Sequence, residues 1–108
     1  MFENINALVF EKEMEQNPEA IILDVRSQWE FESGHIPGAK HLDFFSPYLE
    51  AELNDLDRDK YYLVYCRSGA RSYTACNVMA NMGFKKLANM MGGLIAWRGE
   101  VVTMQEQK

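Results

Sequence analysis

The sequence predicts an α/β fold: one domain over residues 1–108, with a central parallel sheet of about five strands and helices on both faces. Two short apolar runs, AIILDV at 20–25 and YYLVYC at 61–66, are rich in branched and aromatic residues and are typical of strands buried on both sides. Segments with helical spacing of apolar residues alternate with these runs. A chain of 108 residues, 47% of them hydrophobic, can bury one core but not two.

The segment before the first of these strands is expected to be helical. Phe10 and Met14 lie on one face of a helix over residues 7–16, and Asn6 is suited to cap its N-terminus. A strand ahead of this helix, within Met1–Ile5, is only faintly indicated by the pattern. The chain therefore opens with one helix that is well supported and one strand that is not.

Turn and capping residues divide the rest of the chain. Ser27 and Glu30 form a capping-box pattern for a short helix that Gly34 ends, and residues 35–39 have the chemistry of a turn. The remaining predicted elements are a strand at 40–42, a helix at 47–53, the strand at 61–66, a helix ended by Gly83, a strand at 87–90 and a helix after Gly92-Gly93. Helices thus alternate with strands to the end of the chain.

The composition narrows the classes of partner and location. Lys and Arg total 11 against 16 Asp and Glu, and this net charge of −5 argues against a nucleic-acid partner. No apolar stretch approaches the ~20 residues of a membrane span, and the N-terminus lacks the layout of a signal peptide. We therefore expect a cytoplasmic protein that acts neither on nucleic acid nor in a membrane.

The few potential metal ligands do not predict a metal site. The only cysteines are Cys66 and Cys76, and they form no CxxC motif. Their spacing relative to His35 and His41 matches no usual zinc pattern. Neither a metal nor another cofactor is expected.

Cys66 follows the second strong strand and is the main candidate for chemistry. Ligands gather beyond the carboxyl ends of parallel strands, and a helix N-terminus just after the loop would add backbone N–H groups that attract an anion. Such a cysteine should have a lowered pKa, because these amides and the two nearby arginines stabilise its thiolate. The candidate binding residues are those of the loop: Arg67, Ser68, Gly69, Ala70, Arg71 and Ser72. Ser72 could also cap the following helix.

Other reactive residue types have a simpler structural interpretation. Cys76 falls on the apolar stripe of its helix and is expected to be a core residue. His35 lies in a turn, where it should bind backbone carbonyls rather than act as a general base. Asp24, Arg26 and Glu30 are expected to pair locally or to cap, and one of them is a candidate for orienting an arginine of the Cys66 loop.

Three motifs in order resemble those of single-domain rhodaneses, over about residues 20–98. They are LDVRSQWEFESGHIPGAKHL at 23–42, CRSGARS at 66–72 and MGGLIAW at 91–97. The resemblance implies the rhodanese-like fold and sulfur transfer, in which Cys66 takes the outer sulfur of a thiosulfate-like or persulfide donor and holds it as a persulfide. It also implies that the backbone from Arg67 to Ser72 cradles that sulfur. The chain lacks the Gly-x-Pro-Val ending that is common in relatives, which bears on C-terminal packing and not on chemistry.

The partners expected of such a sulfurtransferase are a small sulfur-donor anion, a thiol or cyanide-like acceptor and, in some settings, an acceptor protein. Arg67 and Arg71 would hold the oxyanion end of the donor, with Arg71 better placed for a bidentate contact. Two alternatives stay open. One is a persulfide carrier or regulatory binding module for a partner protein. The other, less favoured, is a cysteine-dependent phosphatase, whose loops are typically Cys-x5-Arg rather than the Cys-x4-Arg found here.

Overall fold

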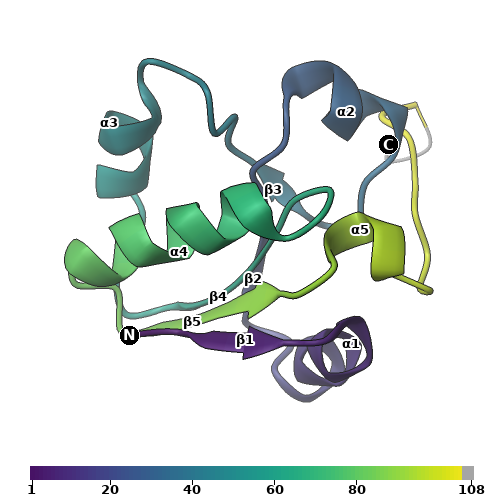
Figure 1. Cartoon of the computed structure of the whole chain (residues 1–108), viewed down its shortest axis with the longest axis horizontal. Helices are drawn as coiled ribbons and strands as arrows, with labels where there is room; N and C mark the ends of the chain where they lie inside the picture. Colours follow the sequence, from purple (N-terminus) through teal and green to yellow (C-terminus); the bar gives the residue numbers. More distant parts are fainter. Residues whose placement is uncertain (106–108) are drawn as a thin grey trace.

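The computed structural model describes residues 1–105, and within them five strands form one parallel sheet. The strands are Glu3–Ile5 (β1), Ile21–Asp24 (β2), Lys40–His41 (β3), Tyr61–Tyr65 (β4) and Lys86–Met90 (β5). Their order across the sheet is β1-β5-β4-β2-β3, with every pairing parallel, as Figure 1 shows. The predicted fold class is confirmed. The predicted domain end at residue 108 lies outside the described residues.

In this part of the chain four helices connect the strands and a fifth follows β5, close to the predicted ranges. They are Ala7–Gln16 (α1), Gln28–Ser33 (α2), Leu49–Asn54 (α3), Ala70–Asn81 (α4) and Gly93–Ala96 (α5). Asn6 caps α1, since its side-chain oxygen accepts a hydrogen bond from the Val9 amide. Ser27 and Glu30 form the predicted capping box at the start of α2. No helix among the described residues is both long enough and apolar enough to span a membrane.

The helices cover both faces of the sheet, and the central strand β4 serves both cores. In Figure 1, α4 lies on one side of the sheet and α1 on the other. Tyr62 and Val64 pack in the same cluster as α3 and α4, whereas Leu63 and Tyr65 pack in the cluster that includes α1 and α2. Fully burying a large apolar side chain contributes about 1.5–3 kcal/mol. The two-sided burial explains why this segment is apolar without alternation.

The weakest predicted strand exists and is short. β1 has three residues and pairs with β5 at the edge of the sheet, with Asn4 opposite Asn89. At the other end of the chain, Val102 forms an isolated antiparallel bridge with His35 and fastens the segment after α5. All carboxyl ends of the strands meet at one edge of the sheet, and the Cys66 loop leaves β4 at that edge.

Candidate active site

The loop after β4 turns sharply at Gly69 and leads directly into α4. Gly69 has a φ of 102°, a conformation that residues with a side chain rarely adopt. A Cβ at this position would also lie 3.2 Å from the backbone of Met90 and of Gly92. Glycine therefore allows the loop to turn and to pack closely against the end of β5.

Three hydrogen-bond donors converge on the buried sulfur of Cys66. The amide of Gly69 lies 3.1 Å from Sγ, the amide of Ser72 lies 3.4 Å away and the Ser72 hydroxyl lies 3.3 Å away. Burial would by itself raise the pKa of the Cys66 thiol, but the bonds from the Ser72 side chain and from the backbone of Ser72, Gly69 and Ser68 outweigh it and lower the pKa. The shift has the predicted direction. We call this group of donors the sulfur cradle.

The role of Ser72 differs from the predicted helix cap. Gly69 is the N-cap residue of α4, without a side-chain capping bond, and Ser72 lies inside the first turn. Its side chain is buried and its hydroxyl donates to the sulfur. The suggestion of a cap was wrong because α4 begins earlier than the position of Ser72 implied. Ala70 is its first residue.

The two loop arginines have different surroundings. Arg71 makes a two-pronged contact with Glu30 of α2, with N–O distances of 2.9 and 3.2 Å. This hydrogen bond lowers the pKa of Glu30 to about 2, against the opposing effect of burial and with help from Ser27. Glu30 is therefore the acidic residue that orients a loop arginine. Arg67 is exposed, and no carboxylate among residues 1–105 forms an ion pair with it.

The charged residues after β2 are structural, as predicted. Arg26 donates to the buried carboxylate of Asp24 at 2.6 Å and to the Gly34 carbonyl at 2.6 Å. His35 is buried, and its Nδ1 lies 2.7 Å from the Phe31 carbonyl oxygen. The imidazole also stacks on the Phe31 ring. These contacts hold together the end of β2, the helix α2 and the turn that follows it.

The Gly92-Gly93 turn and α5 hold the other side of the loop. The amide of Leu94 donates to the Cys66 carbonyl at 2.9 Å, and the amide of Ile95 donates to the Arg67 carbonyl at 3.1 Å. A Cβ at Gly93 would collide with the Arg67 carbonyl group. The third motif of the sequence therefore supports the reactive loop directly.

Asn89 is a supporting residue that the sequence analysis missed. It is 2% exposed in β5, and its Nδ2 donates to the Gly69 carbonyl at 3.3 Å and to Asn4 Oδ1 at 3.0 Å. An amide side chain inside a buried apolar strand needs a partner, so its position was a usable signal. Asn89 thus holds the carbonyl of Gly69, the residue whose amide contacts the Cys66 sulfur.

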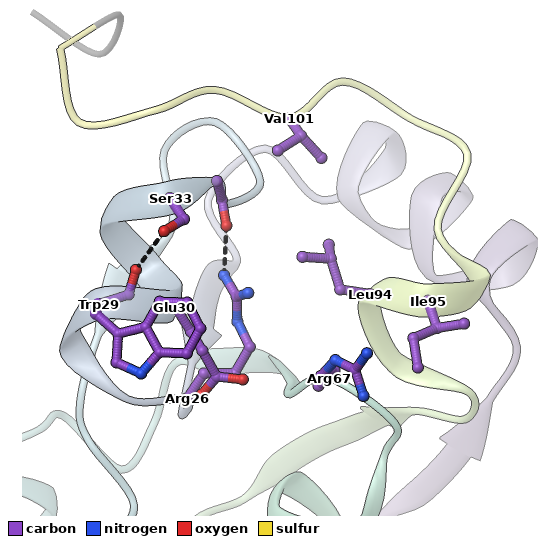
Figure 2. Close-up of a pocket in the computed structure, with 9 residues that line it drawn as sticks. Arg26, Trp29, Glu30, Ser33, Arg67, Leu94, Ile95 and Val101 are labelled. Carbon is purple, nitrogen blue, oxygen red and sulfur yellow. Dashed lines mark hydrogen bonds between the residues drawn. The ribbon is translucent and has the colours of Figure 1, made fainter.

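An open hollow of about 400 Å³ lies beside the loop, between α2 and α5. Figure 2 shows Trp29, Glu30 and Arg26 on one side of it and Leu94, Ile95 and Arg67 on the other. Its lining residues are Arg26, Trp29, Glu30, Ser33, Gly34, Arg67, Leu94, Ile95 and Val101. Cys66 itself is not part of this lining. Arg67, the residue that follows Cys66, is the member of the loop that lines the hollow.

The other predicted residues are the remaining two of the loop and the second cysteine. Ser68 and Ala70 are exposed, and the backbone of Ser68 is one of the groups that lower the pKa of Cys66. Cys76 is fully buried in α4, and burial together with the nearby Cys66 charge raises its pKa to about 12. It is a core residue, as predicted. Among residues 1–105 no group of three or more His, Cys, Asp or Glu side chains could hold a metal ion.

Comparisons with known proteins agree with this geometry. The family model of the rhodanese-like domain matches residues 7–100. The putative sulfurtransferase YtwF of Bacillus subtilis (strain 168) is 35% identical over 89% of this chain and 90% of its own length. The putative sulfur carrier protein YrkF of the same strain is 33% identical over 89% of this chain and 51% of its own length. A rhodanese-like domain protein from Staphylococcus aureus has the same fold, with a TM-score of 0.82 at 24% identity over 94% of this chain and 98% of that chain.

Proposed function

This chain belongs to the rhodanese-like domain family, and on that premise we propose that it is a sulfurtransferase that works through a persulfide on Cys66. The observation that carries the proposal is the sulfur cradle, in which three donors within 3.4 Å of Sγ favour its thiolate. The similarity to a relative named as a putative sulfurtransferase supports the same activity. The reaction needs a reduced Cys66, which a reducing compartment such as the cytoplasm provides.

The proposed chemistry has two steps, each a displacement at a sulfur atom. In the first, the Cys66 thiolate attacks the outer sulfur of a donor such as thiosulfate. The donor's S–S bond breaks, and sulfite leaves with the bonding electron pair. In the second, an acceptor nucleophile attacks the outer sulfur of the persulfide, and the Cys66 thiolate is the leaving group. With cyanide as the acceptor, the product would be thiocyanate. No oxidant or reductant is consumed, and ping-pong kinetics are expected.

The loop residues have separate roles in this proposal. Amides of the segment from Arg67 to Ser72, with the Ser72 hydroxyl, stabilise the negative charge on sulfur. The exposed Arg67 attracts the anionic end of the donor. Arg71 was the preferred anchor for that end, but Glu30 already occupies its guanidinium, so we assign the contact to Arg67 and a supporting role to Arg71. Because Cys66 is fully buried, a slim sulfane end suits the approach best.

The test is the intact mass of the protein before and after exposure to thiosulfate. We expect a gain of one sulfur atom that disappears after treatment with cyanide, with thiocyanate formed in equal amount. The Cys66→Ala variant should gain nothing. A wild-type protein that shows no mass gain with thiosulfate, inorganic polysulfide or an organic persulfide would refute the proposal.

Two other functions, a persulfide carrier and a phosphatase, can be distinguished from a sulfurtransferase by measuring turnover. A persulfide carrier would gain sulfur but pass it slowly to small acceptors, and the likeness to a relative named as a putative sulfur carrier favours this as the second candidate. A phosphatase would hydrolyse an aryl phosphate in a manner that depends on Cys66. The pairing of Arg71 with Glu30 disfavours it, because a phosphate would have to displace Glu30 to use that guanidinium.

A further inference from the structure

The hollow beside the Cys66 loop has more room than an inorganic sulfur donor needs. Its volume of about 400 Å³ would hold on the order of a dozen water molecules at their liquid density. It falls within the roughly 300–1,000 Å³ typical of pockets for organic ligands. Thiosulfate, with a single small polar body, would leave most of this space unused. The size of the hollow is therefore sufficient for an organic occupant.

The walls of the hollow are largely apolar. Trp29 is 70% exposed and Ile95 is 64% exposed, and they face the hollow from α2 and from α5. Figure 2 shows Leu94 beside Ile95, with Val101 above them on the C-terminal segment. Large apolar side chains left in solvent around a concave surface mark a binding groove. An inorganic anion gains nothing from such walls, whereas a hydrocarbon or aromatic group does.

One positively charged side chain of the hollow, that of Arg67, is available to bind an anionic group of a ligand. Of the cations that line it, Arg26 is bound to Asp24 and to the Gly34 carbonyl. The Glu30 carboxylate is bound to Arg71. Arg67 forms no ion pair with any described residue, and it is exposed. A carboxylate on the occupant would form a charge-assisted hydrogen bond there.

The hollow is directly coupled to the reactive loop. Leu94 and Ile95 line it with their side chains, and their amides hold the carbonyls of Cys66 and Arg67. Glu30 lines it as well, and its carboxylate positions Arg71 of the loop. A molecule seated in the hollow would thus contact Arg67, the residue next to Cys66, together with the α5 residues whose amides hold the loop.

We propose that the hollow binds the organic part of the sulfur acceptor, which is a thiol with an apolar or aromatic body and a carboxylate. This rests on the proposed sulfur transfer. The acceptor thiolate attacks the outer sulfur of the Cys66 persulfide and forms a new S–S bond. The bond between Sγ and the outer sulfur breaks, its electron pair stays on Sγ, and the outer sulfur moves to the acceptor with its negative charge. The products are the organic persulfide and the Cys66 thiolate. The reverse reaction makes that persulfide a donor.

The experiment measures single-turnover transfer from protein loaded with persulfide beforehand. The acceptors are 4-(mercaptomethyl)benzoate, which has both a ring and a carboxylate, benzyl mercaptan, which has the ring alone, and cyanide, which has neither. Loss of the extra sulfur is followed by intact mass. For each variant we compare the ratio of a thiol's second-order rate constant to that of cyanide, so that the intrinsic reactivity of each acceptor cancels between proteins.

Three variants separate the contributions of the wall and the charge. We expect Trp29→Ala and Ile95→Ala each to lower the ratio for both ring thiols, by about tenfold for Trp29, since an aromatic contact contributes about 1 kcal/mol beyond its buried area. Arg67→Gln should lower the ratio for 4-(mercaptomethyl)benzoate about tenfold and change that for benzyl mercaptan by less than about twofold. The matched control is Tyr48→Ala, an aromatic residue 70% exposed and outside the lining, which should change no ratio.

Unchanged ratios in both Trp29→Ala and Ile95→Ala would overturn the proposal, as would an equal effect in Tyr48→Ala. A second measurement does not depend on sulfur transfer: the dissociation constant of 4-(methylthiomethyl)benzoate, which cannot react, measured by NMR titration. We expect Trp29→Ala to weaken this binding about tenfold. No saturable binding to wild-type protein would refute the assignment of the hollow. Failure to load the persulfide, with binding intact, would refute the proposed function instead.

Discussion

Cys66 and Cys76 are both fully buried in the same core cluster, yet their thiols differ sharply in acidity. The pKa of Cys66 is lowered, whereas that of Cys76 is raised to about 12. Burial raises both pKa values. The difference comes from hydrogen bonds, because Ser72 and Gly69 donate to Cys66, whereas no residue in the described part of the chain donates to the Cys76 sulfur. A buried thiol thus becomes more acidic through the donors aimed at it, against the effect of its depth.

Position relative to α4 explains which cysteine receives the donors. Cys66 precedes the helix, where the first amides of α4 have no partner within the helix and are free to bind an anion. Cys76 lies in the middle of α4, where each amide is already used by the carbonyl one turn back. The comparison can be tested by four experiments, described from the largest expected effect to the smallest.

Replacing each cysteine in turn should have opposite effects on sulfur uptake. Cys66→Ala should abolish both the mass gain with thiosulfate and thiocyanate formation, because the nucleophile is lost. Cys76→Ala should keep both activities and cost about 1 kcal/mol of unfolding free energy through the small cavity it leaves. Mass spectrometry and urea denaturation provide the two measurements. Persistent sulfur uptake in Cys66→Ala would reverse the assignment of the two thiols.

Disturbing the support of the loop should impair Cys66 strongly. In Gly93→Ala the new methyl group collides with the Arg67 carbonyl, and a shift of about 1 Å in a reactive group can cost about 100-fold in rate. The matched control is Gly38→Ala. Gly38 has a similarly positive φ of 82°, but a Cβ there meets no atom within 4 Å. We expect a large fall in kcat for Gly93→Ala, and for Gly38→Ala a loss of about 1 kcal/mol in stability without loss of kcat.

Removing one donor should make Cys66 more like Cys76. Ser72→Ala deletes the hydroxyl 3.3 Å from Sγ, and a hydrogen bond to a charged group contributes about 1.5–3 kcal/mol, or at least about one pKa unit. The pKa of Cys66 should rise, so that alkylation by iodoacetamide near pH 7 slows about tenfold. The rate at a pH well above the new pKa should recover. A slow rate at every pH would instead indicate a misfolded loop.

The two thiols should affect stability in opposite ways as the pH rises. The folded pKa of Cys66 is lower than the unfolded value, so its contribution grows between the folded pKa and about 9 and is lost as the pH falls through the folded pKa. Cys76 titrates near 12 when folded, so its contribution is lost as the pH rises above about 9. Between pH 9 and 10, Cys76→Ala should lose about 1 kcal/mol less stability than wild type. Urea unfolding at several pH values measures this difference. Equal alkaline losses would contradict it.

The elements and the surroundings of Cys66 could be predicted because their signals are local. The caps at Asn6 and Ser27 are set within three residues, and the apolar run of β4 reports its burial on both faces. The Cys66 loop was recognisable from its sequence because its donors come from the same segment. Local patterns thus predicted the strands, the helices and the loop that donates hydrogen bonds to Cys66.

What the sequence did not reveal depends on contacts between distant segments. Arg71 seemed free to hold a donor until the fold brought Glu30 to it from α2. Asn89 and Gly93 touch the loop only because β4 and β5 are neighbours in the sheet. Ser72 was misjudged for a smaller reason, a helix start displaced by a few residues, which is the least predictable feature of a helix.

The orientation of the peptide groups around Cys66 affects which species can reach it. Thiolates readily capture soft metal ions such as zinc. Here the carbonyls of Cys66 and Arg67 point to the amides of α5, and hydrogens of Gly69 and Ser72 point to the sulfur. Three donors already occupy lone pairs of the sulfur that a bound metal ion would need. The geometry that makes the sulfur anionic therefore also competes with a metal ion for it.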